Sequence, residues 1–386
     1  MPLSKAFHLQ SGYAFKSELF SADQGVPIVR ISNLPIDNKY VDLSDCVYYP
    51  ASENIKQQFI VHKKDLLIAM SGATTGKTAI YNYSYNAFLN QRVGVFKQTS
   101  DKVCYQYLQA IVESQLFTTR LQPLLIAGAQ PNISPSDIEN MIFPFPPLAE
   151  QRKIAEVLGV WDEAIEKQAR LIEKLALRKR GLMQRLLSAK LRLPGFSEPW
   201  KTHKLQELFT ERNETNRTDL PLLSITGDRG VILQTESEKR DTSNDDKSKY
   251  KRIAKGDIGY NTMRMWQGRS ALSGLEGIVS PAYTIVVPNT DVDGYYMSVL
   301  FKQPRLIYDF WTHSQGLVGD TLNCKYRDFG QVHICCPPLA EQKAITEVLT
   351  AADREIELAK EKLEYLRRQK RGLMQQLLTG KKRIKY

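Results

Sequence analysis

The chain contains two copies of one segment. The hexapeptide PPLAEQ occupies residues 146–151 and again residues 337–342, and the match continues without a gap to KRGLMQ at 179–184 and 370–375. Across a 42-residue stretch, 23 positions are identical to the residue 191 positions later. Because twice this offset nearly equals the 386 residues of the chain, the sequence predicts two copies of one unit in tandem.

The repeated segment has the spacing of a long helix. Apolar residues recur at alternating intervals of four and three, as they do along a coiled-coil seam. Pro147 and Pro338 suit a first helical turn, and Glu150 and Glu341 suit the positive end of a helix dipole. We expect the two helices to pair with each other, although a helix of another chain would satisfy the same pattern. The expected seam positions are Ile154, Leu158, Trp161, Ile165, Gln168, Ile172, Leu175, Lys179, Leu182 and Leu186, and their counterparts Ile345, Leu349, Ala352, Ile356, Ala359, Leu363, Leu366, Lys370, Leu373 and Leu377.

A glycine interrupts each helix at the same place in both copies. Gly181 and Gly372 each cost about 1 kcal/mol in a helix interior. Their repetition predicts a close backbone approach or a bend at this position.

Each helix follows a region of about 140 residues that lacks the helical repeat and has a different residue pattern. Short segments rich in β-branched and aromatic residues predict strands, and helical turns are expected around 105–121 and 295–309. The predicted strand segments are DLLIAM (65–70), AIYNYSY (79–85), RVGVFKQ (92–98), GIVSPAYTIVVP (277–288) and QVHICCP (331–337).

These segments predict an α+β fold with two mixed globules and two long antiparallel coiled-coil helices, related by a pseudo-two-fold repeat. The expected division is a globule at 1–145, a helix at 146–190, a second globule at 191–336, a second helix at 337–380 and a basic tail at 381–386.

Charge and cysteine usage narrow the functional classes. Lys and Arg number 53 against 42 Asp and Glu, and the formal charge of +11 suits a polyanion such as nucleic acid. Five cysteines without a C-x-x-C spacing favour a reducing cytoplasm over a zinc or redox site. No run of about 18 apolar residues occurs, so no membrane partner is expected. Histidines are scattered and no nucleophile or dinucleotide motif is present, so we expect no catalytic residue, metal or cofactor in this chain.

The segment SGATTGKT at 71–78 is similar to a phosphate-binding loop. Gly72 and Gly76 are separated by three residues, whereas a P-loop needs four. Aligning Asp65 with Asp257 places DLLIAMSGATTGKTAI over DIGYNTMRMWQGRSAL, so the element itself is duplicated. A tip with a cation and a hydroxyl in both copies suits contacts with DNA phosphates and base edges. A solvated hairpin without a ligand is the simpler alternative.

Two variable globules, each followed by a helix that begins PPLAEQ and contains KRGLMQ, resemble the specificity subunit of type I restriction-modification systems. The resemblance covers nearly the whole chain. Its target-recognition segments correspond to LIAMSGATTGKTAI, LNQRVGVF, NISPSDIENMIFPFPPLAEQ, GDIGYNTMRMWQG and EGIVSPAY.

The resemblance implies that each globule is a target recognition domain reading half of a bipartite, asymmetric DNA sequence, while the paired helices set the unread spacer. It also implies that this chain is not an enzyme. Two modification subunits would dock on it and methylate adenine N6 with S-adenosylmethionine, and restriction subunits would add an ATP- and Mg²⁺-dependent endonuclease.

The candidate site residues fall into two sets. The expected DNA contacts are Thr74, Thr75, Lys77, Thr78, Gln91 and Arg92 in the first domain, and Arg264, Trp266, Gln267, Arg269, Ser270, His313, Lys325 and Arg327 in the second. The expected docking residues for the modification subunits are Pro147, Leu148, Glu150, Gln151, Pro338, Leu339, Glu341 and Gln342. Two alternatives remain, which are a P-loop nucleotidase and a basic coiled-coil scaffold that reads no DNA sequence.

Overall fold

The computed structural model describes residues 1–35, 39–126, 132–227, 229–237, 245–316 and 322–385. It divides into two compact units. Unit 1 comprises Met1–Arg170 with Glu361–Tyr386, and unit 2 comprises Leu171–Lys360. Each unit therefore holds one globular domain together with a part of each long helix.

The domain of unit 1 contains two four-stranded sheets. The first has the order β1-β8-β5-β6 with antiparallel neighbours, and the second has the order β3-β2-β7-β4 with β2 parallel to β7. The strands are β1 (Phe7–Ser11), β2 (Val26–Val29), β3 (Val47–Tyr49), β4 (Ile60–Val61), β5 (Leu66–Ala69), β6 (Thr78–Ile80), β7 (Ala87–Leu89) and β8 (Val93–Gln98). The helices are α1 (Tyr105–Val112), α2 (Gln115–Ile126) and α3 (Pro135–Glu139), with 3-10 turns η1 (Leu3–Lys5), η2 (Ser17–Leu19), η3 (Ile31–Asn33) and η4 (Gln57–Phe59).

The domain of unit 2 has the same kind of central sheet, with the order β10-β17-β14-β15, and three two-stranded ladders. The central strands are β10 (Phe209–Glu211), β14 (Ile258–Asn261), β15 (Ser270–Leu272) and β17 (Tyr283–Pro288). The ladders pair β11 (Leu223–Ile225) with β12 (Val231–Leu233), β13 (Lys251–Ile253) with β16 (Gly277–Val279), and β18 (His333–Cys336) with β9 (Lys201–Lys204). The helical segments are α5 (Leu205–Leu208), η5 (Gln234–Glu236), η6 (Met265–Gln267), α6 (Gly294–Leu300), α7 (Pro304–His313) and α8 (Tyr326–Gln331).

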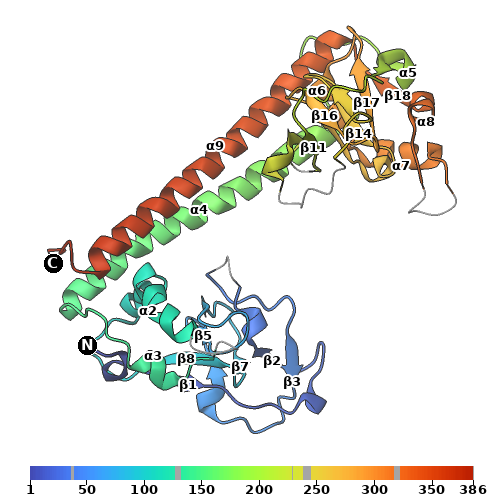
Figure 1. Cartoon of the computed structure of the whole chain (residues 1–386). Coiled ribbons are helices and arrows are strands. Elements are labelled where there is room, and N and C mark those ends of the chain that lie inside the picture. The colour runs from blue at the N-terminus through green and yellow to red at the C-terminus, as the bar shows by residue number, and fades with distance from the viewer. Residues whose placement is uncertain (36–38, 127–131, 228, 238–244, 317–321, 386) are drawn as a thin grey trace. The chain divides into compact units, whose positions relative to one another are not determined.

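Two long helices, α4 (Leu148–Leu186) and α9 (Leu339–Leu378), lie side by side (Figure 1). In unit 1, Ile154 near the start of α4 shares a core with Leu377 at the end of α9. In unit 2, Ile345 near the start of α9 shares a core with Leu186 at the end of α4. None of the expected seam positions, including Trp161, is exposed. The predicted α+β class and the antiparallel pairing of the two helices within one chain are confirmed.

Two local predictions are wrong in part. A Cβ added at Gly181 or Gly372 would meet no atom within 4 Å outside its chain neighbours and its own helix backbone, so a close approach of another backbone does not explain these glycines. The alternative of a bend stays a prediction. The segment AIYNYSY is a strand only as far as Ile80. Tyr81, Tyr83 and Tyr85 instead contact one another through tilted rings, with successive ring centroids 5.4 and 5.3 Å apart. Within the described ranges, no helix has the length and apolar character needed to cross a bilayer.

Candidate nucleic-acid interface

In unit 1, residues 70–77 form a tight turn between β5 and β6, which we call tip 1. The Gly76 amide donates to the Ala69 carbonyl at 2.8 Å, and the Ala69 amide donates to the Lys77 carbonyl at 2.8 Å. Gly76 has a φ of 83°, a left-handed conformation that favours glycine. The turn therefore places Lys77 beside the exit of β5.

The turn excludes a phosphate-binding loop. The amides of Thr75, Gly76 and Lys77 donate to carbonyls at Gly72, Ala69 and Thr74, so they do not converge on a common anion. Thr78 opens strand β6 and not the helix that a P-loop must feed. The nucleotidase alternative therefore fails on its geometry.

In unit 2, residues 262–269 connect β14 to β15 through η6 and form tip 2. The Asn261 amide donates to the Arg269 carbonyl at 3.0 Å, as the Ala69 amide does to Lys77 in unit 1. Gly268 has a φ of 72° and corresponds to Gly76. The backbone bonds therefore bear out the alignment of Lys77 with Arg269 that the sequence predicted.

A second loop meets each tip at the same end of its sheet. In unit 1 the Met70 amide donates to the Arg92 carbonyl at 2.9 Å, so Gln91 and Arg92 adjoin tip 1. In unit 2 the Cys324 amide donates to the Thr262 carbonyl at 2.8 Å, so Lys325 follows a residue bonded to tip 2. Residues far apart in sequence are thus brought together in both units.

Charge distinguishes the tips from the rest of each sheet. At the opposite ends of β5 and β14, carboxylates hold the nearby cations, with Lys97 2.9 Å from Asp65 and Arg212 2.7 Å from Asp257. Among the described residues, no carboxylate forms an ion pair with the cations of the two tips and the adjoining loop, which are Lys77, Arg92, Arg264 and Arg269. Such cations are available to phosphate groups.

The remaining predicted contacts differ in accessibility. Gln91, Arg92, Arg264, Gln267, Arg269, Lys325 and Arg327 are exposed, and Thr74, Thr75, Lys77, Thr78, Trp266 and His313 are half-buried. Ser270 is only 1% exposed and belongs to the core of the sheet, so its hydroxyl is not accessible to a ligand in solution.

Several polar groups of the tips are bonded within the chain. The hydroxyl of Thr75 donates to the Gly72 carbonyl at 2.6 Å, and the hydroxyl of Thr74 donates to the Ile31 carbonyl at 3.3 Å. The indole N–H of Trp266 donates to the Met263 carbonyl at 2.9 Å. The ring Nδ1 of His313 lies 2.8 Å from the Asp309 carbonyl oxygen. These bonds shape the tips and orient their exposed neighbours.

A hairpin that the sequence did not single out completes tip 2. A Cβ at Gly227, in the loop between β11 and β12, would lie 2.6 Å from Nη1 of Arg269. A cavity of about 310 Å³ opens here, lined by Ile225, Thr226, Asn261, Arg264, Arg269 and Tyr283. The glycines of the segment TGDRG at 226–230 are a signal for this hairpin in the sequence, whereas the contact of Gly227 with Arg269 depends on tertiary packing between residues about 40 positions apart.

The heads of the two long helices are built into their own units. Glu150 and Glu341 are each 1% exposed, and Gln151 and Gln342 are each 2% exposed. Gln151 Oε1 accepts the Cys104 amide at 2.9 Å, and Gln342 Oε1 accepts the Asp293 amide at 3.0 Å. The four polar residues of the predicted docking set therefore bond within the chain. Of the apolar members, Pro147 is exposed, and Leu148, Pro338 and Leu339 are half-buried.

Glu150 is an ion-pair partner of the chain's own C-terminal region. Its two carboxylate oxygens accept hydrogen bonds from Arg383 at 2.7 and 2.6 Å. These bonds from Arg383 hold the pKa of Glu150 below its ordinary value against the opposing effect of burial. A charged, buried glutamate thus marks the head of α4.

Comparison with known proteins gives one consistent family. The model of the type I restriction modification DNA specificity domain matches residues 2–176. The putative type I restriction enzyme MjaX specificity subunit of Methanocaldococcus jannaschii is 26% identical, with 94% of this chain and 88% of that protein aligned.

Solved structures share the fold over nearly the full length. The S subunit of a type I restriction-modification system from M. genitalium superposes with a TM-score of 0.55 at 15% identity, covering 98% of this chain and 95% of that one. A chain from a structural study of complex assembly and conformational transition of the type I R-M system gives a TM-score of 0.61 at 16% identity, covering 98% and 97%.

Proposed function

The chain belongs to the family of type I restriction-modification specificity subunits, and from this premise we propose that its two units each read one half of a bipartite, asymmetric DNA target. The observation that carries the proposal is the pair Lys77 and Arg269. Both follow a left-handed glycine, both accept the same backbone hydrogen bond, and neither has a carboxylate partner among the described residues.

The surroundings of this pair differ between the units, as two different half-sequences require. Tip 1 presents small hydroxyl residues, whereas tip 2 carries Arg264, Trp266 and Gln267 and is completed by the β11–β12 hairpin. Cations supply affinity that is independent of sequence, while side chains on the groove edges supply discrimination. The duplicated scaffold with divergent tips accounts for an asymmetric target.

We propose that α4 and α9 set the unread spacer between the half-sites. Each is one continuous helix of about 40 residues, and a helix rises about 1.5 Å per residue. The number of helical residues would therefore fix the spacer without any base contact.

Repeated surface residues favour two copies of one partner. Arg180 and Arg371 are identical and exposed, as are Gln184 and Gln375, and none has a side-chain bond among the described residues. Packing within the chain therefore does not explain their repetition. A common partner that docks once on each helix end would explain it.

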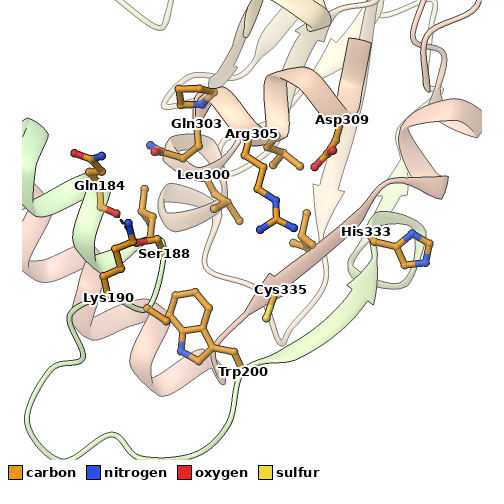
Figure 2. Close-up of a pocket in the computed structure, with 15 residues that line it drawn as sticks. Gln184, Ser188, Lys190, Trp200, Leu300, Gln303, Arg305, Asp309, His333 and Cys335 are labelled. Atoms are coloured by element: carbon orange, nitrogen blue, oxygen red, sulfur yellow. Dashed lines mark hydrogen bonds between the residues drawn. The ribbon is translucent and has the colours of Figure 1, made fainter. Parts of the chain in front are cut away.

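Three of these repeated residues, Gln184, Arg371 and Gln375, line cavities at the ends of the two long helices. In unit 2, a cavity of about 430 Å³ separates the end of α4, with Gln184 and Ser188, from Gln303 and Arg305 at the start of α7 (Figure 2). In unit 1, a cavity of about 520 Å³ separates the end of α9 from the start of α2. We propose that the two modification subunits dock at these two helix ends.

The chemistry would then belong to the partner chains. Modification subunits would bind S-adenosylmethionine and methylate adenine N6 in each half-site, and restriction subunits would contribute the ATP- and Mg²⁺-dependent nuclease. Within the described residues, no group of three or more His, Cys, Asp or Glu side chains is arranged to hold a metal ion. In this proposal, the chain chooses the DNA sequence and places its partners on it.

The test is to co-express the chain with candidate modification subunits and to map N6-methyladenine across a genome. We expect a single motif made of two different half-sequences with a fixed spacer. A basic scaffold that reads no sequence would give either no methylation or methylation without a motif, and this result would remove the proposal.

A further inference from the structure

Four charged side chains form a closed ring in unit 1. Lys39 Nζ lies 2.8 Å from Glu113 Oε1 and 3.0 Å from Asp162 Oδ2. Lys370 Nζ lies 3.1 Å from Glu113 Oε2 and 2.6 Å from Asp162 Oδ1. Each carboxylate oxygen therefore faces one ammonium group, and the two positive charges balance the two negative ones. We call these four residues the charge ring.

The ring joins the recognition domain to both long helices. Lys39 belongs to the domain, and Glu113 caps the C-terminus of α1. Asp162 lies on α4 and Lys370 lies on α9. An ion pair within one element only stabilises that element, whereas this arrangement fixes the domain against the helix pair.

The backbone of Lys39 leads directly to tip 1. The Ile80 amide donates to the Lys39 carbonyl at 2.9 Å, and the Val41 amide donates to the Ile80 carbonyl at 3.1 Å. Ile80 is the last residue of β6, and Thr78, which directly follows tip 1, is its first. Only this short strand separates the ring from the candidate DNA contacts.

Partial burial strengthens the ion pairs of the charge ring. The side chain of Lys370 is 11% exposed and that of Glu113 is 21% exposed. Partly buried charges interact more strongly than charges at the surface, and they lose much of this interaction if a partner moves away. A cavity of about 500 Å³ adjoins the ring, so the domain has space to shift if the ring opens.

In the described part of the chain, unit 2 has the ring's ion pair between the two helices but lacks its ion pairs between the helices and the domain. The counterparts of Asp162 and Lys370 are Asp353 and Lys179, which pair at 2.5 Å. The residue that corresponds to Glu113, two positions before the following helix, is Lys302. Lys302 has the opposite charge, and burial and the nearby Lys179 lower its pKa. Among the described residues, the domain contacts Asp353 through a neutral group, the hydroxyl of Tyr295 at 2.6 Å.

We propose that the charge ring is a positioning device that holds the unit 1 recognition domain at one angle on the helix pair, and so fixes where its half-site lies relative to the spacer. This inference rests on the proposed function. Lys39 is the residue of the recognition domain that pairs with Asp162 of α4. It influences DNA recognition indirectly, through its backbone bonds to β6.

The test compares Lys39→Met with Lys97→Met in the complex with modification subunits. Both lysines belong to the same domain, both form ion pairs, and their side chains are 30% and 34% exposed. Lys97 pairs with Asp65 inside the domain and does not reach the helices. Methylation is measured on a DNA library in which both half-sequences are constant and the spacer varies by one base pair in each direction.

We expect Lys39→Met to reduce the preference for the matched spacer over the shifted spacers by about tenfold, which corresponds to about 1.4 kcal/mol. Lys97→Met should keep the parental preference even if it lowers the melting temperature. Lys39→Arg should restore the preference because it keeps the charge. Unchanged spacer discrimination in Lys39→Met would overturn the proposal.

Two further measurements separate the possible failures. If Lys39→Met does not fold, Glu113→Gln removes one charge of the ring while keeping the size and polarity of the side chain, and it must show the same loss of spacer preference. If the parental complex yields no two-part motif, the proposed function fails. If it yields one and both ring variants keep its spacer strictly, only the role of the ring is refuted.

Discussion

Arg383 binds both carboxylate oxygens of Glu150, with Nε at 2.7 Å and Nη2 at 2.6 Å. The residues 191 positions earlier and later, Arg192 and Glu341, form the same pair at 2.6 and 2.7 Å. Each glutamate heads one long helix, and each arginine follows the end of the other helix. The repeat therefore closes each unit with a bidentate pair between the two helices, a geometry that gives strong and specific hydrogen bonds.

The two arginines should differ in their contribution to stability. The side chain of Arg192 is 27% exposed and that of Arg383 is 64% exposed, and Trp200 donates an additional bond to Glu341 at 3.2 Å. We expect Arg192→Ala to lower the free energy of unfolding by about 3 kcal/mol and Arg383→Ala by about 1 to 2 kcal/mol, since each strands a buried carboxylate. Urea unfolding measures both values. Arg178→Ala, which removes a surface pair with Glu355, is the control and should change little.

The Arg383 pair should make stability depend on pH in a defined direction. Hydrogen bonds from Arg383 lower the pKa of Glu150 in the folded chain. A glutamate with a lowered folded pKa stabilises the fold above its unfolded pKa, and this contribution is lost as pH falls through the folded value. The difference in unfolding free energy between the parent and Arg383→Ala should therefore be constant from pH 6 to 8 and shrink below about pH 4.5. A difference that grows on acidification would contradict this assignment, and Glu150→Gln should abolish the pH dependence of the difference.

The regular helix seam could be predicted from the sequence, whereas contacts between residues far apart in the sequence could not. The seam from Ile154 to Leu186 is visible because its residues share one helix and one spacing. Glu150 also has a visible helix-start role, but its partner Arg383 lies 233 residues away. No spacing rule connects such residues, so nothing in the sequence indicated this buried ion pair, and the docking role expected for Glu150 stays a prediction.

In the candidate interface, too, local structure was predictable from the sequence and long-range contacts were not. The alignment of Lys77 with Arg269 was predictable because a turn between paired strands is a local structure with a fixed glycine position. The hairpin that places Gly227 against Arg269 was missed because it arrives through tertiary packing. Ser270 was misjudged for a related reason, since its exposure depends on which face of β15 is covered.

The repeated helix glycines give a direct test of why they are present. Open space surrounds the Cβ position of Gly181 and Gly372, so Gly181→Ala and Gly372→Ala should each raise the free energy of unfolding by about 1 kcal/mol. Thermal or urea unfolding of the isolated chain measures this gain. Gly76→Ala is the contrasting control, because its φ of 83° and a Leu121 methyl 2.3 Å from the added Cβ should make it destabilising. Destabilisation by either helix substitution would show that the surrounding space is not open.

Removing the tip cations should weaken DNA binding in proportion to the number of phosphates that they neutralise. For Lys77→Ala and Arg269→Ala in the assembled complex, we expect lower affinity and a slope of log affinity against log salt that is smaller by about 0.9 for each phosphate no longer neutralised. Binding titrations at several salt concentrations measure both quantities. Lys167→Ala, which changes an exposed lysine on the surface of α4, is the matched control and should leave the slope unchanged. Equal slopes for all three variants and the parent would show that the two tips do not contact DNA phosphates.

Lengthening both long helices should lengthen the DNA spacer while the half-sequences stay the same. The natural place is between Arg170 and Leu171 in α4 and between Lys360 and Glu361 in α9, where the boundary between the units crosses both helices. Seven inserted residues keep the seam in register and add about 10 Å, close to the rise of about three base pairs. A methylome of the complex should then report the parental half-sequences with a longer spacer. Inserting two residues in each helix is the control, because it rotates the seam out of register and should abolish methylation without creating a new spacer. An unchanged spacer in a folded, active heptad variant would mean that the helices do not measure the distance between the half-sites.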